Sequence, residues 1–234
     1  MEIIAHRGLH NTCPENSFAA IKQAVDNNIS AIEIDVRKCK TGEVVLFHDR
    51  NLKAKAGYNK YVIKTTFNTI SKLQLKSGGS AHKIPDLRKV FSEFGADLNY
   101  VLDIKKETWI NDGLEENLIS LVQEFGLMDK VIFSSFNHYS AKRVARFAPE
   151  ARVGLILVHP FQIKLFNIDP FTSLHVDYRH LSKLNIKQIK NSGKKIYVWT
   201  LNDGEICKDI VSKYPIDGII SDNPLEIKRV LAAE

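Results

Sequence analysis

Short apolar, strand-like runs recur along the chain, and amphipathic helical patterns separate most of them. Two of the helical patterns are Ser17–Asn27 and Glu115–Glu124, in which apolar residues return at helical spacing. Strands that alternate with helices indicate a parallel sheet built from βα units. With eight or nine such units and no dinucleotide-binding glycine motif, the pattern predicts an α/β fold of the TIM (β/α)₈ barrel type. The expected strands are 2–6, 31–36, 44–48, 100–104, 131–136, 152–157, 173–178, 195–200 and 217–222.

Two features depart from a regular barrel. Nine strand candidates are one too many, and the link between 31–36 and 44–48 is too short to hold a helix. Either one strand lies outside the barrel or this pair forms an extended hairpin, and the pattern leaves both open. The long polar segment 49–99 is expected to be a loop-rich insertion at the barrel mouth after the third strand. The whole chain, 1–234, is expected to form a single domain.

The composition is that of an ordinary globular protein, with 44% hydrophobic and 26% charged residues. The formal net charge is +6, but the lysines are spread along the chain and form no block. We therefore expect no nucleic-acid binding, and a mildly basic surface that attracts small anionic substrates.

The sequence gives no sign of export or of membrane insertion. No apolar run is long enough to span a bilayer, and the N-terminus shows no basic-then-apolar leader. The three cysteines, Cys13, Cys39 and Cys207, are scattered without CxxC spacing. This pattern argues against a disulfide framework or a zinc site and favours a cytoplasmic protein.

Polar residues recur where the predicted strands end, which is where barrel enzymes carry their reactive groups. Taken singly, each has an ordinary structural explanation, such as a buried ion pair or a hydrogen-bonded histidine. Inward acids are costly unless they pair or bind a cation, so several of them at one rim favour a functional site. The residues are His6, Arg7, Glu33, Asp35, His48, Asp49, Asp103, Lys105, Trp199, Thr200 and Asn202.

The residue types point to phosphate-ester chemistry. Three carboxylates without a nearby cysteine pair describe an oxygen-rich site for one hard divalent cation, Mg²⁺ or Ca²⁺. Two histidines beside that ion could act as general base and general acid. The arginine fork and the lysine supply positive charge that matches a phosphate.

The ordered motifs resemble the glycerophosphodiester phosphodiesterase (GDPD) family. They begin with "AHRG", "PENS" and "AIEIDVRKCKTGEVVLFHD", and continue with "IPDL", "SSF", "VWTLN" and "DGIISDNP". The resemblance covers nearly the whole chain apart from most of 49–83. The family usually has ExK on its fourth strand, where this chain has Asp103-x-Lys105, and it often has an arginine where this chain has Ala54.

The resemblance implies a TIM barrel that hydrolyses glycerophosphodiesters to sn-glycerol 3-phosphate and an alcohol with a divalent cation. It also implies a role for each matching residue. His6 and His48 would be the acid–base pair; Glu33, Asp35 and Asp103 would hold the metal; Arg7 and Lys105 would contact phosphate; Phe136 and Trp199 would form an apolar wall near the glycerol.

Within this interpretation His6 is the expected base and His48 the expected acid, although the sequence does not fix which is which. Gly8 would allow a tight turn beside His6 and Arg7. Thr12 and Glu15 are expected to form a capping box for the next helix. The remaining histidines match no motif position and are taken as structural.

Two alternatives remain open. One is a related phosphodiesterase acting on lysophospholipids or phosphoinositides, which would need an exposed apolar lip. The insertion offers only scattered Tyr58, Tyr61 and Phe67, so a small soluble glycerophosphodiester and no stable membrane association are favoured. The other is a barrel that binds a phosphorylated ligand without turning it over.

Overall fold

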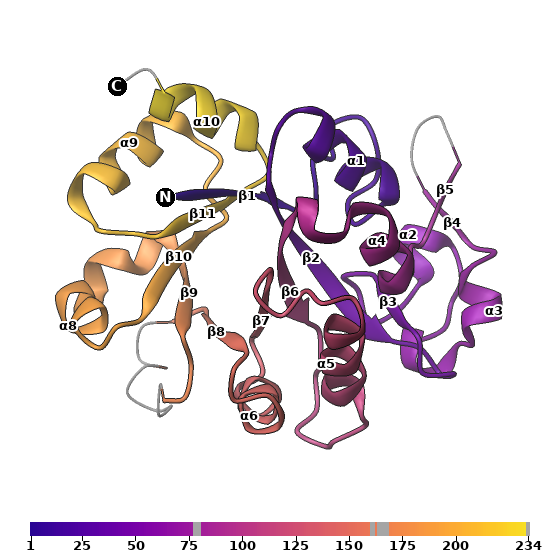
Figure 1. The fold of residues 1–234 in the computed structure, drawn as a ribbon. Helices are drawn as coiled ribbons and strands as arrows, with labels where there is room; N and C mark the ends of the chain where they lie inside the picture. The colour runs from indigo at the N-terminus through magenta and orange to yellow at the C-terminus, as the bar shows by residue number, and fades with distance from the viewer. Residues whose placement is uncertain (77–80, 160–161, 163–168, 233–234) are drawn as a thin grey trace.

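The computed structural model describes residues 1–76, 81–159, 162 and 169–232. Eight parallel strands close into a barrel in the order β1-β11-β10-β9-β8-β7-β6-β2, and β2 pairs back to β1 (Figure 1). The predicted TIM barrel is therefore confirmed. The strands are β1 (Glu2–His6), β2 (Ala31–Lys38), β6 (Asn99–Ile104), β7 (Val131–Ser135), β8 (Arg152–Leu157), β9 (Ser173–Asp177), β10 (Lys195–Trp199) and β11 (Gly218–Ser221).

The strand candidate in excess of eight is 44–48, where the structure has β3 (Val44–Leu46). This strand lies outside the parallel barrel. It pairs antiparallel with the end of β2, with Val36 opposite Leu46 and Lys38 opposite Val44. A short antiparallel return needs no helix, which explains why only a few residues separate the two strands.

Helices surround the barrel and bury their apolar sides against the outer face of the sheet (Figure 1). The 3₁₀ helix η3 (Tyr178–Lys183) follows β9. The helices of this layer are α1 (Phe18–Asp26), α4 (Leu87–Phe94), α5 (Leu114–Glu124), α6 (His138–Phe147), α8 (Ile186–Asn191), α9 (Gly204–Lys213) and α10 (Pro224–Ala232).

The start of α1 differs from the expected capping box. Ser17 is the N-cap, and its hydroxyl accepts a hydrogen bond from the backbone N–H of Ala20. The Thr12 side chain instead bonds Gln23, and the Glu15 carboxylate pairs with Arg7 and Lys55. The capping-box prediction was wrong because the basic groups nearby bind Glu15 more strongly than a backbone N–H can.

Segment 49–99 contains several short elements and one helix of the outer layer. Helix α4 packs into the main core through Leu87, Val90, Phe91 and Phe94. Residues 77–80 of this segment lie outside the described residues. The other elements are α2 (Lys53–Ala56), η1 (Val62–Lys64), α3 (Phe67–Ile70), the paired strands β4 (Gln74–Leu75) and β5 (His82–Lys83), and η2 (Gly95–Asp97).

A small separate core lies beneath these short elements. It joins β3 and the residues next to it to the segment itself, so the segment packs on the edge of the barrel. The buried residues are Cys39, Val45, Phe47, Leu52, Val62, Ile70, Leu75 and Ile84.

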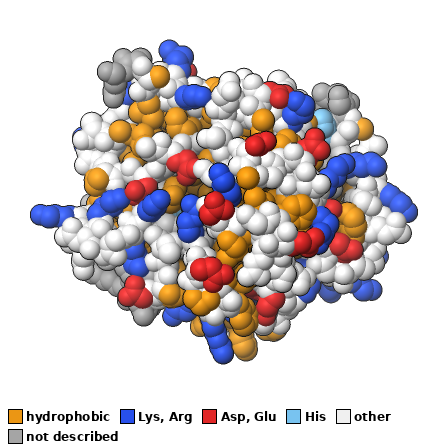
Figure 2. Space-filling view, in the orientation of Figure 1, with side chains coloured by type: hydrophobic (Ala, Val, Ile, Leu, Met, Phe, Trp, Pro, Cys, Tyr) orange, Lys and Arg blue, Asp and Glu red, His pale blue; other side chains and the backbone are white. Residues whose placement is uncertain are grey.

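On the face shown in Figure 2, basic and acidic side chains are interspersed. This arrangement agrees with the spread of lysines along the sequence. None of the described helices combines the length and apolar character needed to cross a bilayer.

Candidate active site

A cavity of about 200 Å³ opens at the carboxyl end of the barrel strands. It collects residues that are more than a hundred positions apart in sequence, because parallel strands all end at this rim. Eight of the nine site residues predicted from the sequence line it: His6, Arg7, Glu33, His48, Asp103, Lys105, Phe136 and Trp199.

The ninth, Asp35, is fully buried and lies within the same group of carboxylates. Asp35 and Asp103 are register partners on β2 and β6, and Glu33 is the register partner of His6 on β1. One oxygen from each of Glu33, Asp35 and Asp103 lies within 4.8 Å of the others.

Three buried carboxylates so close together raise one another's affinity for protons. Burial, followed by the charges of Asp35 and Asp103, raises the pKa of Glu33 well above its ordinary value. Burial also raises the pKa of Asp103, although Lys105 opposes the shift. Burial alone would raise the pKa of Asp35 as well, but Lys105 and Arg7 hold it below the ordinary value. The group therefore contains excess negative charge that a cation would offset.

The donor set fits a hard divalent cation. All three groups offer carboxylate oxygen, the ligand that Mg²⁺ and Ca²⁺ prefer. The Oδ1 atom of Asp103 is buried and has no hydrogen-bond partner among the described residues, so it is available as a ligand. Leaving such an oxygen unpaired is costly in a site without a cation.

Two cationic side chains flank the carboxylates. The Lys105 ammonium lies 2.5 Å from Asp103 Oδ2 and 3.0 Å from Asp35 Oδ1. Burial would lower the pKa of Lys105, but these two carboxylates raise it above the ordinary value, so the side chain is charged. Arg7 pairs with Glu15 at 2.8 Å and with Asp35 at 3.1 Å. The sequence did not indicate that Glu15 belongs to this network.

The backbone at the end of β1 is unusual. Arg7 has a φ of 59°, a left-handed conformation that residues with side chains seldom adopt. Gly8 follows with a φ of 80°, and a Cβ atom there would lie 2.7 Å from the carbonyl carbon of Ala20. The tight turn brings the N–H of Arg7 to the Glu33 carboxylate at 3.2 Å. Strain of this kind is typical of functional sites.

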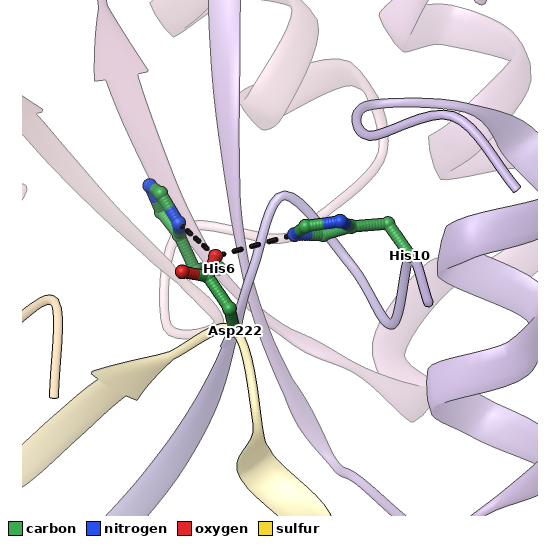
Figure 3. A group of neighbouring side chains, drawn as sticks. All are labelled: His6, His10 and Asp222. Carbon is green, nitrogen blue, oxygen red and sulfur yellow. Dashed lines mark hydrogen bonds and ion pairs between the residues drawn. The ribbon is translucent and has the colours of Figure 1, made fainter. Parts of the chain in front are cut away.

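His6 is held from behind by a carboxylate. Its Nδ1 lies 2.6 Å from Oδ1 of Asp222, and the same oxygen lies 3.2 Å from Nε2 of His10 (Figure 3). Asn202 donates to the other oxygen of Asp222 at 2.8 Å. Burial would raise the pKa of Asp222, but the hydrogen bonds from His10 and His6 hold it far below the ordinary value. Because a carboxylate only accepts, Nδ1 of His6 carries the hydrogen and Nε2 is free on the side of Glu33, 3.9 Å away.

The Nδ1 atom of His48 is also held by a carboxylate. It lies 2.8 Å from Oδ1 of Asp49, which again leaves Nε2 free. The backbone carbonyl of His48 accepts from the guanidinium of Arg37 at 2.9 and 2.8 Å, which holds the end of this segment against β2.

Two aromatic side chains form part of the cavity wall. The rings of Phe136 and Trp199 meet edge to face with centroids 5.6 Å apart. The Lys105 ammonium lies 5.1 Å from the centroid of Phe136, which is a cation–π contact.

Several residues of the site were not among those predicted. Asn16 holds Asp35 through two hydrogen bonds, of 2.6 and 3.0 Å. His175 lines the cavity and is buried. His10, taken as structural from the sequence, lies in the His6–Asp222 group. The signal for Asp222 was present, since "DGIISDNP" ends the last strand as "AHRG" ends the first.

The carboxyl rim of this closed parallel barrel brings together buried carboxylates, two histidines and two basic side chains. This arrangement is that of a phosphodiesterase of the TIM-barrel class. Comparison with known proteins agrees. Residues 6–226 match the model of the glycerophosphoryl diester phosphodiesterase family. The chain belongs to this family.

Individual relatives span nearly the whole chain. A glycerophosphodiester phosphodiesterase from Caldanaerobacter subterraneus subsp. tengcongensis is 34% identical over 231 residues, which cover 95% of this chain and 94% of the relative. A phosphodiesterase from Oleispira antarctica, solved in complex with sn-glycerol 3-phosphate, superposes with a TM-score of 0.79 at 26% identity over 99% of this chain and 97% of its own. A glycerophosphodiester phosphodiesterase from Thermotoga maritima gives a TM-score of 0.76 at the same identity and coverage.

Proposed function

We propose that this protein hydrolyses glycerophosphodiesters to sn-glycerol 3-phosphate and an alcohol, with one divalent cation, Mg²⁺ or Ca²⁺. The observation that supports this most directly is that two histidines, each with Nδ1 held by a carboxylate, line one small cavity. Three carboxylates and two basic side chains lie beside them in the same site. The family and the relative solved with sn-glycerol 3-phosphate support the same substrate class.

Glu33, Asp35 and Asp103 would hold the cation. When bound, it would supply positive charge to the phosphoryl oxygens as negative charge builds on them. Lys105 and Arg7 lie against the same carboxylates and are charged, so they add donors for a phosphate at the same place.

The two histidines then divide the proton transfers. His6 takes a proton at Nε2 from the attacking group, either a water or the glycerol 2-hydroxyl. Its Nδ1–H remains hydrogen-bonded to the Asp222 carboxylate, which stabilises the imidazolium that forms. His48, the more exposed of the two, gives a proton to the departing alkoxide on the open side of the cavity. Phe136 and Trp199 cover the non-reacting carbons.

Replacing His48 by alanine tests the role of this side chain. General acid catalysis contributes about 10²- to 10⁴-fold, so we expect His48→Ala to lower kcat for glycerophosphocholine by about 100-fold or more. His82→Ala is the matched control, because His82 lies in β5 and outside the cavity lining. Near-normal turnover by His48→Ala would contradict the assignment.

A further inference from the structure

Arg37 follows the two acids of β2 on the same face of the strand. Glu33, Asp35 and Arg37 are spaced two residues apart, so their side chains leave the strand on one side. The Arg37 side chain is 10% exposed and does not line the cavity, in contrast to those of Arg7 and Lys105. It therefore lies behind the cavity wall and does not face a substrate.

All the nitrogens of the Arg37 guanidinium have partners. Nε and Nη2 donate to the carbonyl oxygen of His48 at 2.9 and 2.8 Å. Nη1 donates to the carbonyl oxygen of Lys105 at 3.2 Å and pairs with Oε1 of Glu107 at 2.8 Å. One planar group thus joins the backbone of His48 to the backbone of Lys105.

The segment that carries His48 has few other attachments to the barrel. It follows β3, which is three residues long and is the last strand in the sheet order. Beyond β3, the N–H of Phe47 donates to the carbonyl oxygen of Asp35 at 3.0 Å. The bonds from Arg37 to the His48 carbonyl come next along the chain, so they extend the attachment to β2 as far as His48.

Lys105 is attached to the barrel independently of Arg37. Its N–H donates to the carbonyl oxygen of Val36 at 3.1 Å, and its ammonium pairs with two carboxylates of the site. Loss of the guanidinium should therefore displace His48 more than it displaces Lys105.

The shape of the Arg37 side chain matters more here than its charge. Glu107 lies against the guanidinium and offsets the positive charge. A lysine at this position would keep the charge, but its donors all belong to one nitrogen, whereas the arginine fork places donors on separate atoms. Only the fork can hold the two carbonyl groups at once in a fixed geometry.

From these contacts we infer that Arg37 is a positioning residue that sets the place of His48 relative to the phosphate by joining its backbone to that of Lys105. The inference rests on the proposed function and adds a residue to it. Misplacement of a reacting group by about 1 Å can lower the rate about 100-fold. Arg37 thereby governs the proton transfer from His48 to the leaving group, while substrate binding stays with the groups that line the cavity.

The test compares Arg37→Ala with the wild type on glycerophosphocholine and on the p-nitrophenyl ester of glycerol 3-phosphate. The choline alkoxide needs a proton as it leaves, but p-nitrophenolate is stable without one. Arg143→Ala is the matched control, because Arg143 also donates to a backbone carbonyl, that of Trp109, and pairs with the carboxylate of Glu115. Arg143 is not among the residues that line the cavity.

We expect Arg37→Ala to lower kcat for glycerophosphocholine by about 30-fold or more, with KM and the kcat for the nitrophenyl ester changed by less than about threefold. Arg37→Lys, which keeps the charge, should show the same difference between substrates. It also carries the comparison if Arg37→Ala does not fold. Arg143→Ala should change neither kcat by more than about threefold. Equal losses on both substrates, or full activity in Arg37→Ala or Arg37→Lys, would overturn the inference.

Guanidinium ion provides a second measurement. Arg37 also lines a separate groove of about 130 Å³, so a small cation can reach the space that Arg37→Ala leaves. Guanidinium at a concentration that does not denature the protein should raise kcat of this variant for glycerophosphocholine by about tenfold, and methylammonium should not. No recovery, or equal recovery with methylammonium, would also overturn the inference. Failure of the wild-type protein to cleave either substrate under any metal would instead contradict the proposed function.

Discussion

Asp222 places its carboxylate 2.6 Å from Nδ1 of His6, although 216 residues separate the two in the chain. The contact exists because β11 pairs with β1 and closes the barrel, which brings the end of the last strand to the end of the first. In this position Asp222 fixes which nitrogen of His6 carries the hydrogen.

This relationship predicts the effect of Asp222→Asn. Asn202 donates to the outer oxygen of Asp222, so the carbonyl oxygen of the new amide would face Asn202 and its NH₂ group would face His6. His6 Nδ1 would then have to accept, and the hydrogen would move to Nε2, where the base is needed. We expect kcat for glycerophosphocholine to fall by about 100-fold or more, with the far-UV circular dichroism unchanged. A decrease of less than threefold would contradict the role of Asp222.

Asp103→Asn should weaken cation binding. The substitution removes one of the three carboxylates and the orphaned Oδ1 charge while keeping the side-chain size. Calorimetric titration with Mg²⁺ and with Ca²⁺ should show affinity reduced by about tenfold or more. Asp177→Asn is a fitting control, because Asp177 is equally buried at the end of β9 but pairs with Arg179. Equal affinities in the wild type and Asp103→Asn would place the cation elsewhere.

Gly8→Ala should destabilise the fold more than an ordinary left-handed glycine does. Both the positive φ and the approach of the Ala20 backbone oppose a Cβ atom at this position. We expect the free energy of unfolding in urea to fall by about 2–5 kcal/mol. Gly126 has a φ of 66° and no heavy atom within 4 Å of its hypothetical Cβ, so Gly126→Ala should cost only about 1–2 kcal/mol. Equal losses would show that the close approach to α1 is unimportant.

His175 predicts a pH dependence of stability. Burial lowers its pKa to about 3, from an ordinary value of 6.5. Between these values the unfolded chain binds a proton at this side chain and the folded protein does not. The free energy of unfolding should therefore fall as the pH drops from 6.5 toward 3, by up to about 1.4 kcal/mol per pH unit from this residue.

The variant that isolates this effect is His175→Gln, which can keep the contact to the Ser173 hydroxyl, now 3.1 Å from Nε2. Urea unfolding at a series of pH values should show a shallower slope for the variant than for the wild type over this interval. Parallel slopes would mean that His175 is protonated in the folded state.

The sequence was sufficient for the barrel and for most of the site because both are encoded locally. All nine apolar runs that it marked as strands form strands, and the predicted site residues lie within these strands or within two residues of their ends. Parallel strands in one barrel must end at one rim, so the meeting of Glu33, Asp35 and Asp103 follows from topology.

The rest depends on contacts that no local pattern encodes. The position of β3 depends on antiparallel pairing, which a run of three apolar residues does not specify. Glu15 does not take part in a capping box, because it forms ion pairs with Arg7 and Lys55, which come from different parts of the chain.

The most direct measurement is the release of sn-glycerol 3-phosphate from glycerophosphocholine and glycerophosphoethanolamine, with EDTA, Mg²⁺ and Ca²⁺ compared in parallel. The proposed function predicts release that depends on one of the two cations and stops in EDTA. Undiminished release in EDTA would contradict the cation site formed by Glu33, Asp35 and Asp103. No release under any of these conditions would contradict the proposed hydrolysis itself.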